Sequence, residues 1–297
     1  MILASILPIE KIGMEEVSLV SKKRNIISWS VFLGLIVVLL VLVFVIPGNE
    51  KAESIQETMQ DAVLHERGLI SLFGLINVNP GLISGFLVTI ILLVFAVIVR
   101  IFFIPKFKYV PGKFQLLIEQ AVGFFDNLAV SNSPHHNKFL SCYIFGAGAY
   151  IFVGTLFELV GIQVVAVNGV SMALPAPLSD INGAIAIGCF SYLVIMAGGI
   201  YANKAKGVLL TLKEFSLPIS MSFRLFGALL SGLLVSELVY YYLQLSFILP
   251  VIVGVLFTLI HALVQTYVLT MLTALFYGEV SEVKPKKKKE KKVKASI

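Results

Sequence analysis

The chain has 297 residues, of which 58% are hydrophobic and 13% charged, and its mean hydropathy is +0.95. Soluble domains are about 45–50% apolar and about 25% charged, so this composition excludes an ordinary soluble enzyme, a disordered protein and a nucleic-acid-binding protein. The net charge of +6 comes from one tail, because residues 284–294 hold eight lysines and one glutamate and the other residues together carry −1. The two cysteines, Cys142 and Cys189, are expected to be small buried hydrophobic residues, without disulfide or metal-binding spacing.

Six apolar runs are long enough to form transmembrane helices. They are 26–46, 81–104, 139–167, 181–201, 215–243 and 247–277. The first run is too long for the apolar core of a signal peptide and ends at Pro47 without a small-residue cleavage site, so we interpret it as a spanning helix. The sequence therefore predicts an all-α polytopic membrane protein with about six transmembrane helices, the last two forming a long hairpin.

Residues 111–133 lie between the second and third runs and have a mixed composition. Their apolar residues recur at helical spacing, which is typical of an amphipathic helix on the membrane surface. The chain is expected to divide into five parts. They are a cytoplasmic segment 1–25, an additional transmembrane helix 26–47, an outer loop 48–80, a membrane domain 81–280 and a Lys-rich cytoplasmic tail 281–297.

The basic residues indicate the orientation. They cluster before the first run, after the second and fourth runs, and after the sixth. Residues 48–80 are net acidic, and residues 168–180 contain no Lys or Arg. Because cytoplasmic loops carry the excess of Lys and Arg, both termini are expected in the cytoplasm.

Arg224 is the most informative of the few ionisable residues inside the apolar runs, which are costly in a bilayer and are functional candidates by default. It lies about 14 Å into the fifth run, at 1.5 Å per residue. Ser220, Gly227, Ala228 and Ser231 share its predicted helical face, and such small residues allow another helix to approach closely. We therefore expect Arg224 to meet a partner, such as a carboxylate, inside the membrane. The alternative is an arginine that extends to the cytoplasmic surface.

The fifth and sixth runs form a predicted hairpin that brings further polar residues toward Arg224. From the outer surface inward they are Glu237, His261 and then Gln265, which is predicted to lie level with Arg224. This order fits the movement of a proton or small cation. The alternatives are hydrogen bonding between helices for His261 or Gln265, and contact with outer water for Glu237. The fifth run would form about 43 Å of helix against about 30 Å of hydrocarbon, so it is expected to tilt strongly.

The residues around Arg224 resemble those of subunit a of F-type ATP synthases. The run Ser-Met-Ser-Phe-Arg-Leu-Phe-Gly, from Ser220 to Gly227, is similar to the segment around that family's essential arginine. Other stretches match in the same order: 111–119, 159–161, 178–182, 213–215 and 264–268. The resemblance covers roughly residues 105–280, and the ordered set is far more specific than any single motif.

The chain departs from the family pattern at several positions. Ala228 stands where Asn usually follows the arginine motif, Leu233 where an acidic residue or His is usual, and Glu158 where Asn is common. His261 lies closer to Gln265 than is usual in the family. The first apolar run is an addition to the usual five-helix pattern.

The resemblance implies a non-catalytic stator subunit of a rotary ion motor in a bacterial cytoplasmic membrane. Arg224 would face a ring of c-subunits, and two offset half-channels would carry a proton or sodium ion. The implied partners are the c-ring, the peripheral-stalk b subunits, the rest of the complex and the lipid bilayer, with no nucleic acid, cofactor or metal. The expected outer half-channel residues are Glu237, His261, Gln265, Glu158, Asp180 and Asn182. The expected inner half-channel residues are Glu214, Ser216 and Ser220.

Two other classes of function remain as alternatives. A stand-alone secondary proton or cation transporter is disfavoured because no internal repeat is visible. An intramembrane enzyme is disfavoured because the apolar runs contain no metal-ligand cluster or nucleophile–base pair. The Lys-rich tail is expected to be a solvated end of the chain, with attraction to anionic lipid as the alternative.

Overall fold

The computed structural model describes residues 29–34, 37–38, 41, 56, 69–72, 76–133, 137–167, 169, 171–241 and 249–282. The helices from residue 69 onward are α3 (Pro80–Ile98), α4 (Lys113–Asn132), α5 (Asn137–Val160), α6 (Ile181–Asn203), α7 (Ala205–Lys213), α8 (Ser216–Tyr241) and α9 (Leu249–Ser281). A π-helical turn η1 (Val99–Phe103) and a 3₁₀ turn η2 (Ile104–Lys106) extend α3, and a second 3₁₀ turn, η3 (Pro177–Ser179), precedes α6. The antiparallel strand pairs are β1 (Ile70–Leu72) with β2 (Ile76–Val78), and β3 (Gln163–Val165) with β4 (Ser171–Ala173).

Five helices in the described part of the chain are long and apolar enough to cross a membrane. They span Pro80–Lys106, Lys138–Val160, Ile181–Asn203, Ser216–Ser236 and Val251–Ser281. The chain is therefore an all-α polytopic membrane protein, as the sequence predicts. The predicted segment 1–25, more than half of the segment 26–47, most of the loop 48–80 and nearly all of the tail 281–297 lie outside the described residues.

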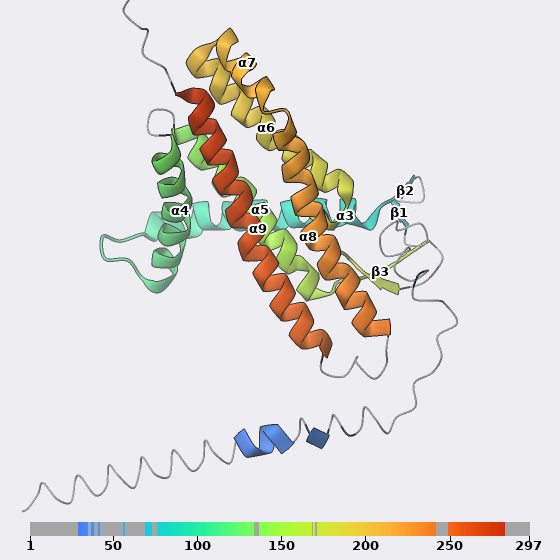
Figure 1. The fold of residues 1–297 in the computed structure, drawn as a ribbon. Coiled ribbons are helices and arrows are strands. Elements are labelled where there is room, and N and C mark those ends of the chain that lie inside the picture. Colours follow the sequence, from blue (N-terminus) through green and yellow to red (C-terminus); the bar gives the residue numbers. More distant parts are fainter. Residues whose placement is uncertain are drawn as a thin grey trace, which may run out of the picture.

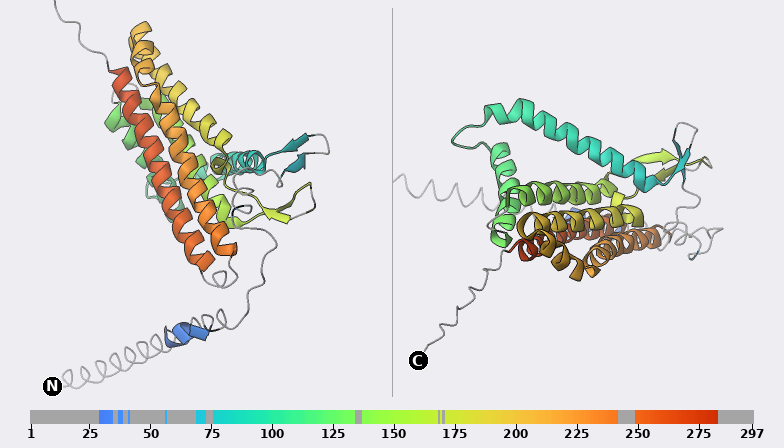
Figure 2. Two further views of the ribbon diagram at one scale, coloured as in Figure 1. Left: turned by 45° about the vertical axis from the view of Figure 1, so that its right-hand side comes forward. Right: turned by 90° about the horizontal axis from the view of Figure 1, so that it is seen from above.

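The helices are arranged in layers (Figures 1 and 2). α8 and α9 lie side by side in front, α5 and α6 pack behind them, and α3 crosses behind this bundle at a steep angle. α4 stands against α5 and α9, at the end of α3 opposite the strand pairs. We call the end of the bundle with the strand pairs the outer end, and the end that holds α7 and the last turns of α9 the inner end.

The core lies between α5, α6, α8 and α9. All four helices contribute fully buried side chains to it, among them Ile144, Ile195, Leu225 and Ala274. α3 joins it through a smaller cluster centred on Val88, which is completely buried. Along the rest of α3 most apolar side chains are exposed, as expected for a helix surrounded by lipid.

The α6–α7 connection is a tight reversal at the inner end. Lys204 between them has a φ of 52°, in the region that favours glycine. A Cβ on Gly207 would overlap the carbonyl oxygen of Gly199, so the two helices approach to a separation that only glycine permits. The amide of Asn203 donates hydrogen bonds to the carbonyl of Val280 (2.8 Å) and to that of Glu282 (3.1 Å), which ties the end of α9 to this turn.

A buried non-helical segment closes the bundle at its outer end. Residues 174–179, which include η3, are all buried, and we call them the outer plug. Pro177 of the plug lies beside glycines of α3, α5 and α6, and η3 also contacts α8. Hydrogen bonds satisfy part of its backbone. The N–H of Leu174 donates to the carbonyl of Ile162 (2.8 Å), and the hydroxyl of Ser179 donates to the carbonyl of Ala176 (2.7 Å). Irregular backbone is tolerated at such a depth only where protein covers it.

The structure corrects the third predicted span and the predicted burial of the cysteines. α5 ends at Val160 rather than continuing to Val167, because Gly161 adopts a φ of 60° that terminates the helix, and residues 163–165 form β3. Cys142 and Cys189 are both exposed on the outside of the bundle.

Candidate functional site

α8 has two faces of opposite character. The residues of one face are buried in the core and recur every four positions: Leu217, Met221, Leu225 and Leu229. None of them is more than 8% exposed. Residues four apart form one stripe along a helix, so this 26-residue helix is held along much of its length by a single face.

Arg224 lies on the exposed face of α8. Ser220, Gly227 and Ser231 are exposed on the same side, and Phe223 is 62% exposed. A Cβ on Gly227 would meet no atom within 4 Å, so nothing in the described part of the chain covers this face there. Among the described residues, no hydrogen bond or ion pair engages Arg224. A permanent cation in a spanning helix is costly without a counter-charge.

A close contact between α6 and α8 fixes the position of α8 just before Arg224. A Cβ on Gly188 of α6 would overlap the hydroxyl of Ser222 and would lie 3.0 Å from the carbonyl oxygen of Pro218. That hydroxyl donates to the same carbonyl at 2.7 Å, within its own helix. Only a glycine in α6 lets α8 lie this close.

α9 continues the exposed apolar face beside α8. Its exposed side chains include Leu256, Ile260, Leu263, Val264 and Tyr267. Its polar residues point inward instead, since Gln265 is 6% and Thr266 is 7% exposed. The fronts of α8 and α9 therefore form one apolar surface that carries Arg224.

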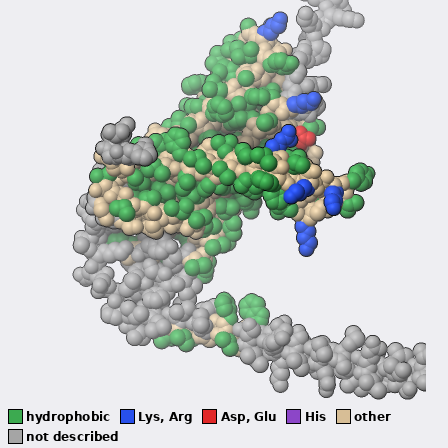
Figure 3. Space-filling model, turned by 180° about the vertical axis from the view of Figure 1, so that it is seen from behind, with side chains coloured by type: hydrophobic (Ala, Val, Ile, Leu, Met, Phe, Trp, Pro, Cys, Tyr) green, Lys and Arg blue, Asp and Glu red, His purple; other side chains and the backbone are tan. Residues whose placement is uncertain are grey.

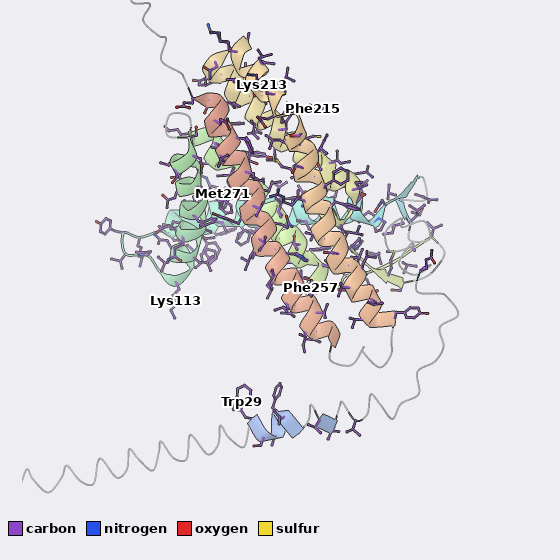
Figure 4. All side chains as sticks on the ribbon, in the orientation of Figure 1. Trp29, Lys113, Lys213, Phe215, Phe257 and Met271 are labelled. Carbon is purple, nitrogen blue, oxygen red and sulfur yellow. The ribbon has the colours of Figure 1, made fainter. Side chains whose placement is uncertain are left out.

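His261 lies where α9 meets α8. Its Nδ1 is 3.5 Å from the position of a Cβ on Gly232, and its ring centroid is 5.8 Å from that of Phe257, which Figure 4 labels toward the outer end of α9. Counting inward from this contact, Gln265 is one helical turn further along α9, and Arg224 is two turns further along α8. Gln265 therefore lies about one turn outward of Arg224 rather than level with it.

Asp180 and Asn182 lie at the outer start of α6. Asp180 is the N-cap residue, and its Oδ1 accepts hydrogen bonds from the backbone N–H (3.2 Å) and the side-chain amide (3.3 Å) of Asn182. A Cβ on Gly81 would lie 2.9 Å from the Cβ of Asp180, so this cap packs against the first turn of α3. No described contact joins Asp180 to His261 or Gln265. A structural role as a helix cap thus accounts for Asp180 locally.

Glu158 lies in the last turn of α5, near the outer part of α9. The neighbouring Leu159 is 3.9 Å from the position of a Cβ on Gly254 of α9. This contact brings Glu158 to the outer half of α9, the half that contains His261. The backbone of Glu237 belongs to α8, and its side chain lies outside the described part of the structure.

The predicted inner residues gather at the α7–α8 junction, where Figure 4 shows Lys213 and Phe215. Glu214 follows α7 and is half-buried, whereas Ser216 and Ser220 are exposed. Ser216, Ser220 and Arg224 are spaced four residues apart, so they follow one another in successive turns on one side of α8.

Sequence reasoning missed the buried hydroxyl groups. Most of them donate to a carbonyl one turn earlier in their own helix: Ser84, Thr155, Ser191, Thr211, Ser222, Thr270 and Thr273. The hydroxyl of Tyr143 instead crosses from α5 to Ser191 of α6, at 2.7 Å. Thr266 Oγ1 is buried and has no hydrogen-bond partner among the described residues. The recurrence of Thr at helical spacing in α9 is the sequence signal that could have revealed them.

Comparison with known proteins places this arrangement in a family. The family model described as ATP synthase A chain matches residues 83–278, from α3 to the end of α9. ATP synthase subunit a of Wigglesworthia glossinidia brevipalpis is 28% identical over 250 residues, which cover 73% of this chain and 86% of that protein. ATP synthase subunit a of Histophilus somni (strain 129Pt) is 26% identical over 199 residues, 56% of this chain and 73% of the relative. That of Aeromonas salmonicida (strain A449) is 25% identical over 244 residues, 67% of this chain and 90% of the relative. The chain thus belongs to the ATP synthase A chain family, whose members are subunit a of ATP synthases.

Proposed function

We propose that the chain is the ion-translocating stator subunit of an F-type ATP synthase, without a catalytic site of its own, and that Arg224 faces the c-subunit ring. The observation that carries the proposal is that Arg224 is exposed on α8, while the buried residues Leu217, Met221 and Leu225 hold that helix in the core. A charge presented in this way has a fixed position and is open to a partner.

The chemistry of arginine suits this role. Its guanidinium stays protonated in proteins, so it remains a cation when a ring carboxylate has just released its ion. The ion pair must form and break at each step, which requires that neither state be too stable. The small residues Ser220 and Gly227 beside Arg224 allow the ring to approach closely.

The outer half-channel, in this proposal, is formed by Glu237, His261, Gln265 and Glu158, with Asp180 and Asn182 near its mouth. The positions of Glu158 and His261 by the outer half of α9 support a route from that end toward Arg224. The order of His261, Gln265 and Arg224 in successive turns supports it as well. The transported ion is a proton or sodium.

The inner half-channel, in this proposal, runs along Glu214, Ser216 and Ser220. Two of these side chains are exposed on the same side of α8 as Arg224, one and two turns away from it. Small hydroxyl residues leave room for water beside the helix and can hydrogen-bond to it. The two routes would then meet the ring on opposite sides of one cation.

The proposed partners are the c-ring, the b subunits of the peripheral stalk, the other subunits of the complex and the bilayer. The proposed location is a bacterial cytoplasmic membrane, with both termini in the cytoplasm. Figure 3 supports this orientation, because Lys and Arg gather at one end of the described surface, while most of the rest is apolar or uncharged.

The decisive experiment replaces Arg224 in membrane vesicles that hold the assembled complex. We expect Arg224→Ala to abolish ion-driven ATP formation, and Arg224→Lys to lose most of it, because an ammonium cannot form the bidentate fork of a guanidinium. Both variants should insert normally, since Ala and Lys are good helix formers.

The matched control is Arg100→Ala, which removes an exposed arginine from η1. It should retain ATP synthesis. Near wild-type synthesis by Arg224→Ala, with the subunit present in the complex, would refute the proposal. Ion transport by the purified chain without other subunits would instead favour a stand-alone transporter.

A further inference from the structure

The connection between α3 and α4 projects on the side of the molecule opposite the strand pairs. Residues 104–114 form this connection, which we call the elbow, and it extends beyond the rest of the bundle in Figure 1. Figure 4 shows Lys113 where the elbow enters α4, well apart from Lys213 on α7. The elbow also lies apart from α8, the helix that carries Arg224, in Figure 1.

Hydrogen bonds and ring packing give the elbow a defined shape. The backbone N–H of Lys108 donates to Gln115 Oε1 at 3.0 Å, and Gln115 Nε2 donates back to the carbonyl of Lys108 at 2.8 Å. Gln115 Nε2 also donates to Glu119 Oε1 at 2.7 Å. The rings of Phe103 and Phe114 pack with their centroids 4.5 Å apart and close the base of the elbow. Because these contacts join its two ends, the residues between them are held in place.

The elbow presents both apolar and cationic groups. Tyr109 is 102% and Val110 is 79% exposed, the largest exposures among the described hydrophobic residues. Lys106, Lys108 and Lys113 are exposed around them. No acidic residue occurs between residues 100 and 118, so these charges are not neutralised within the segment.

The length of the preceding span favours a position of the elbow at the level of the lipid headgroups. The span from Pro80 to Lys106 has 27 residues and would extend about 40 Å as a helix, enough to carry its inner end through the hydrocarbon into the headgroup region. The last residues of the span, including Ile101 and Phe102, are exposed apolar side chains that continue to the elbow. Tyrosine and lysine side chains are favoured at this level of a membrane.

We propose that the elbow binds the headgroups of anionic phospholipids: Lys106, Lys108 and Lys113 contact the phosphates, and Tyr109 and Val110 enter the interface between them. Charge complementarity favours an anionic lipid over a zwitterionic one. The apolar continuity with the exposed surface of α3 favours lipid over a soluble partner. The proposal does not depend on ion translocation, so either can fail alone.

A tryptophan placed at the tip can report which lipid lies there. The chain has one tryptophan, Trp29, so a Trp29→Phe, Tyr109→Trp variant carries a single fluorophore, at position 109. The full chain would be reconstituted in phosphatidylcholine and phosphatidylglycerol mixtures in which one lipid at a time has brominated acyl chains that quench nearby tryptophan. We expect phosphatidylglycerol to be preferred at position 109 by about five-fold or more, the factor for one lysine near an anionic surface. High salt should remove most of this preference.

Two further variants isolate the cause. Adding Lys106→Gln, Lys108→Gln and Lys113→Gln should make the two lipids quench equally. A Trp29→Phe, Phe86→Trp control places the fluorophore at a lipid-exposed position of α3 without nearby cations, and should show no preference. Equal quenching at position 109 by both lipids, a preference that survives the three glutamines, or no quenching by either lipid would each overturn the proposal.

Discussion

Replacing Gly188 with alanine tests whether the close contact between α6 and α8 sets the position of Arg224. The new methyl group would overlap the hydroxyl of Ser222 and lie 3.1 Å from its backbone nitrogen, as well as close to the carbonyl of Pro218. The hydroxyl can rotate, but the backbone atoms cannot yield without a shift of the helix. α8 must therefore move by a few tenths of an ångström.

The magnitude follows from two opposing terms. Alanine is better than glycine inside a helix by about 1 kcal/mol. Overpacking a tight contact costs about 1–3 kcal/mol. We expect Gly188→Ala to lower the free energy of unfolding by about 1 kcal/mol overall. The displaced Arg224 should lower ATP synthesis, even in complexes that assemble fully.

The matched control is Gly146→Ala in α5. A Cβ at Gly146 would meet no atom within 4 Å, so only the helix-forming term remains, and stability should rise by about 1 kcal/mol. Unfolding in mixed detergent micelles, followed by circular dichroism, would measure both variants. Adding Ser222→Ala to Gly188→Ala should restore part of the lost stability, because it removes the hydroxyl that the new methyl group would overlap. The recovery should be incomplete, because the contacts with the backbone of Pro218 and Ser222 remain. If Gly188→Ala is as stable and active as Gly146→Ala, the contact does not position α8.

Three further predictions follow from local geometry. Lys204→Gly should raise the free energy of unfolding by about 1 kcal/mol, because a φ of 52° costs a lysine more than a glycine, and an unchanged unfolding midpoint would contradict this. Thr266→Val should stabilise the chain by about 1 kcal/mol by removing a buried hydroxyl that has no partner among the described residues, whereas Thr270→Val, which loses a bonded hydroxyl, should gain less in the same unfolding assay. Cysteine in place of His261 should react with a small thiol reagent added from the outer side, and cysteine in place of Ser216 with reagent from the inner side; the reverse pattern would exclude the proposed half-channels.

The sequence predicted the spanning helices well where an apolar run has polar residues at both of its ends. The fourth run, 181–201, matches α6 (Ile181–Asn203), because Asp180 caps its start and Lys204 follows its end. The prediction failed at residues 161–167, where the run stays apolar but the backbone leaves the helix at Gly161. Hydropathy measures how strongly residues prefer an apolar environment to water, and it does not distinguish an apolar helix from an apolar strand.

The candidate site was predictable in part. Helical spacing alone places the small residues of α8 on one face with Arg224, and the prediction that a partner meets Arg224 there stays a prediction. In the structure Ser220, Gly227 and Ser231 of this face are exposed, whereas Ala228 is half-buried. The level of Gln265 was not predictable, because it depends on the contact between His261 and Gly232, and that contact depends on how two helices pack. The unpaired hydroxyl of Thr266 is likewise a product of packing rather than of pattern.

The outer plug has a consequence for the order in which the chain folds. Its residues 174–179 are buried, and they pack against α3, α5, α6 and α8. α3 and α5 precede the plug in the sequence, α6 follows it directly, and α8 comes later. During synthesis α8 emerges last of these helices. Until it enters the membrane, one side of the plug has no protein to cover it, and uncovered irregular backbone is unstable in hydrocarbon.

In the proposed orientation, we therefore expect the plug to remain in the outer aqueous phase until the second half of the chain has been inserted. It can sink between the helices only when α8 arrives, so its burial is a late step that joins the two halves of the protein. A chain that stops before α8 should hold residues 174–179 open to proteases on the outer side, whereas the complete chain should protect them.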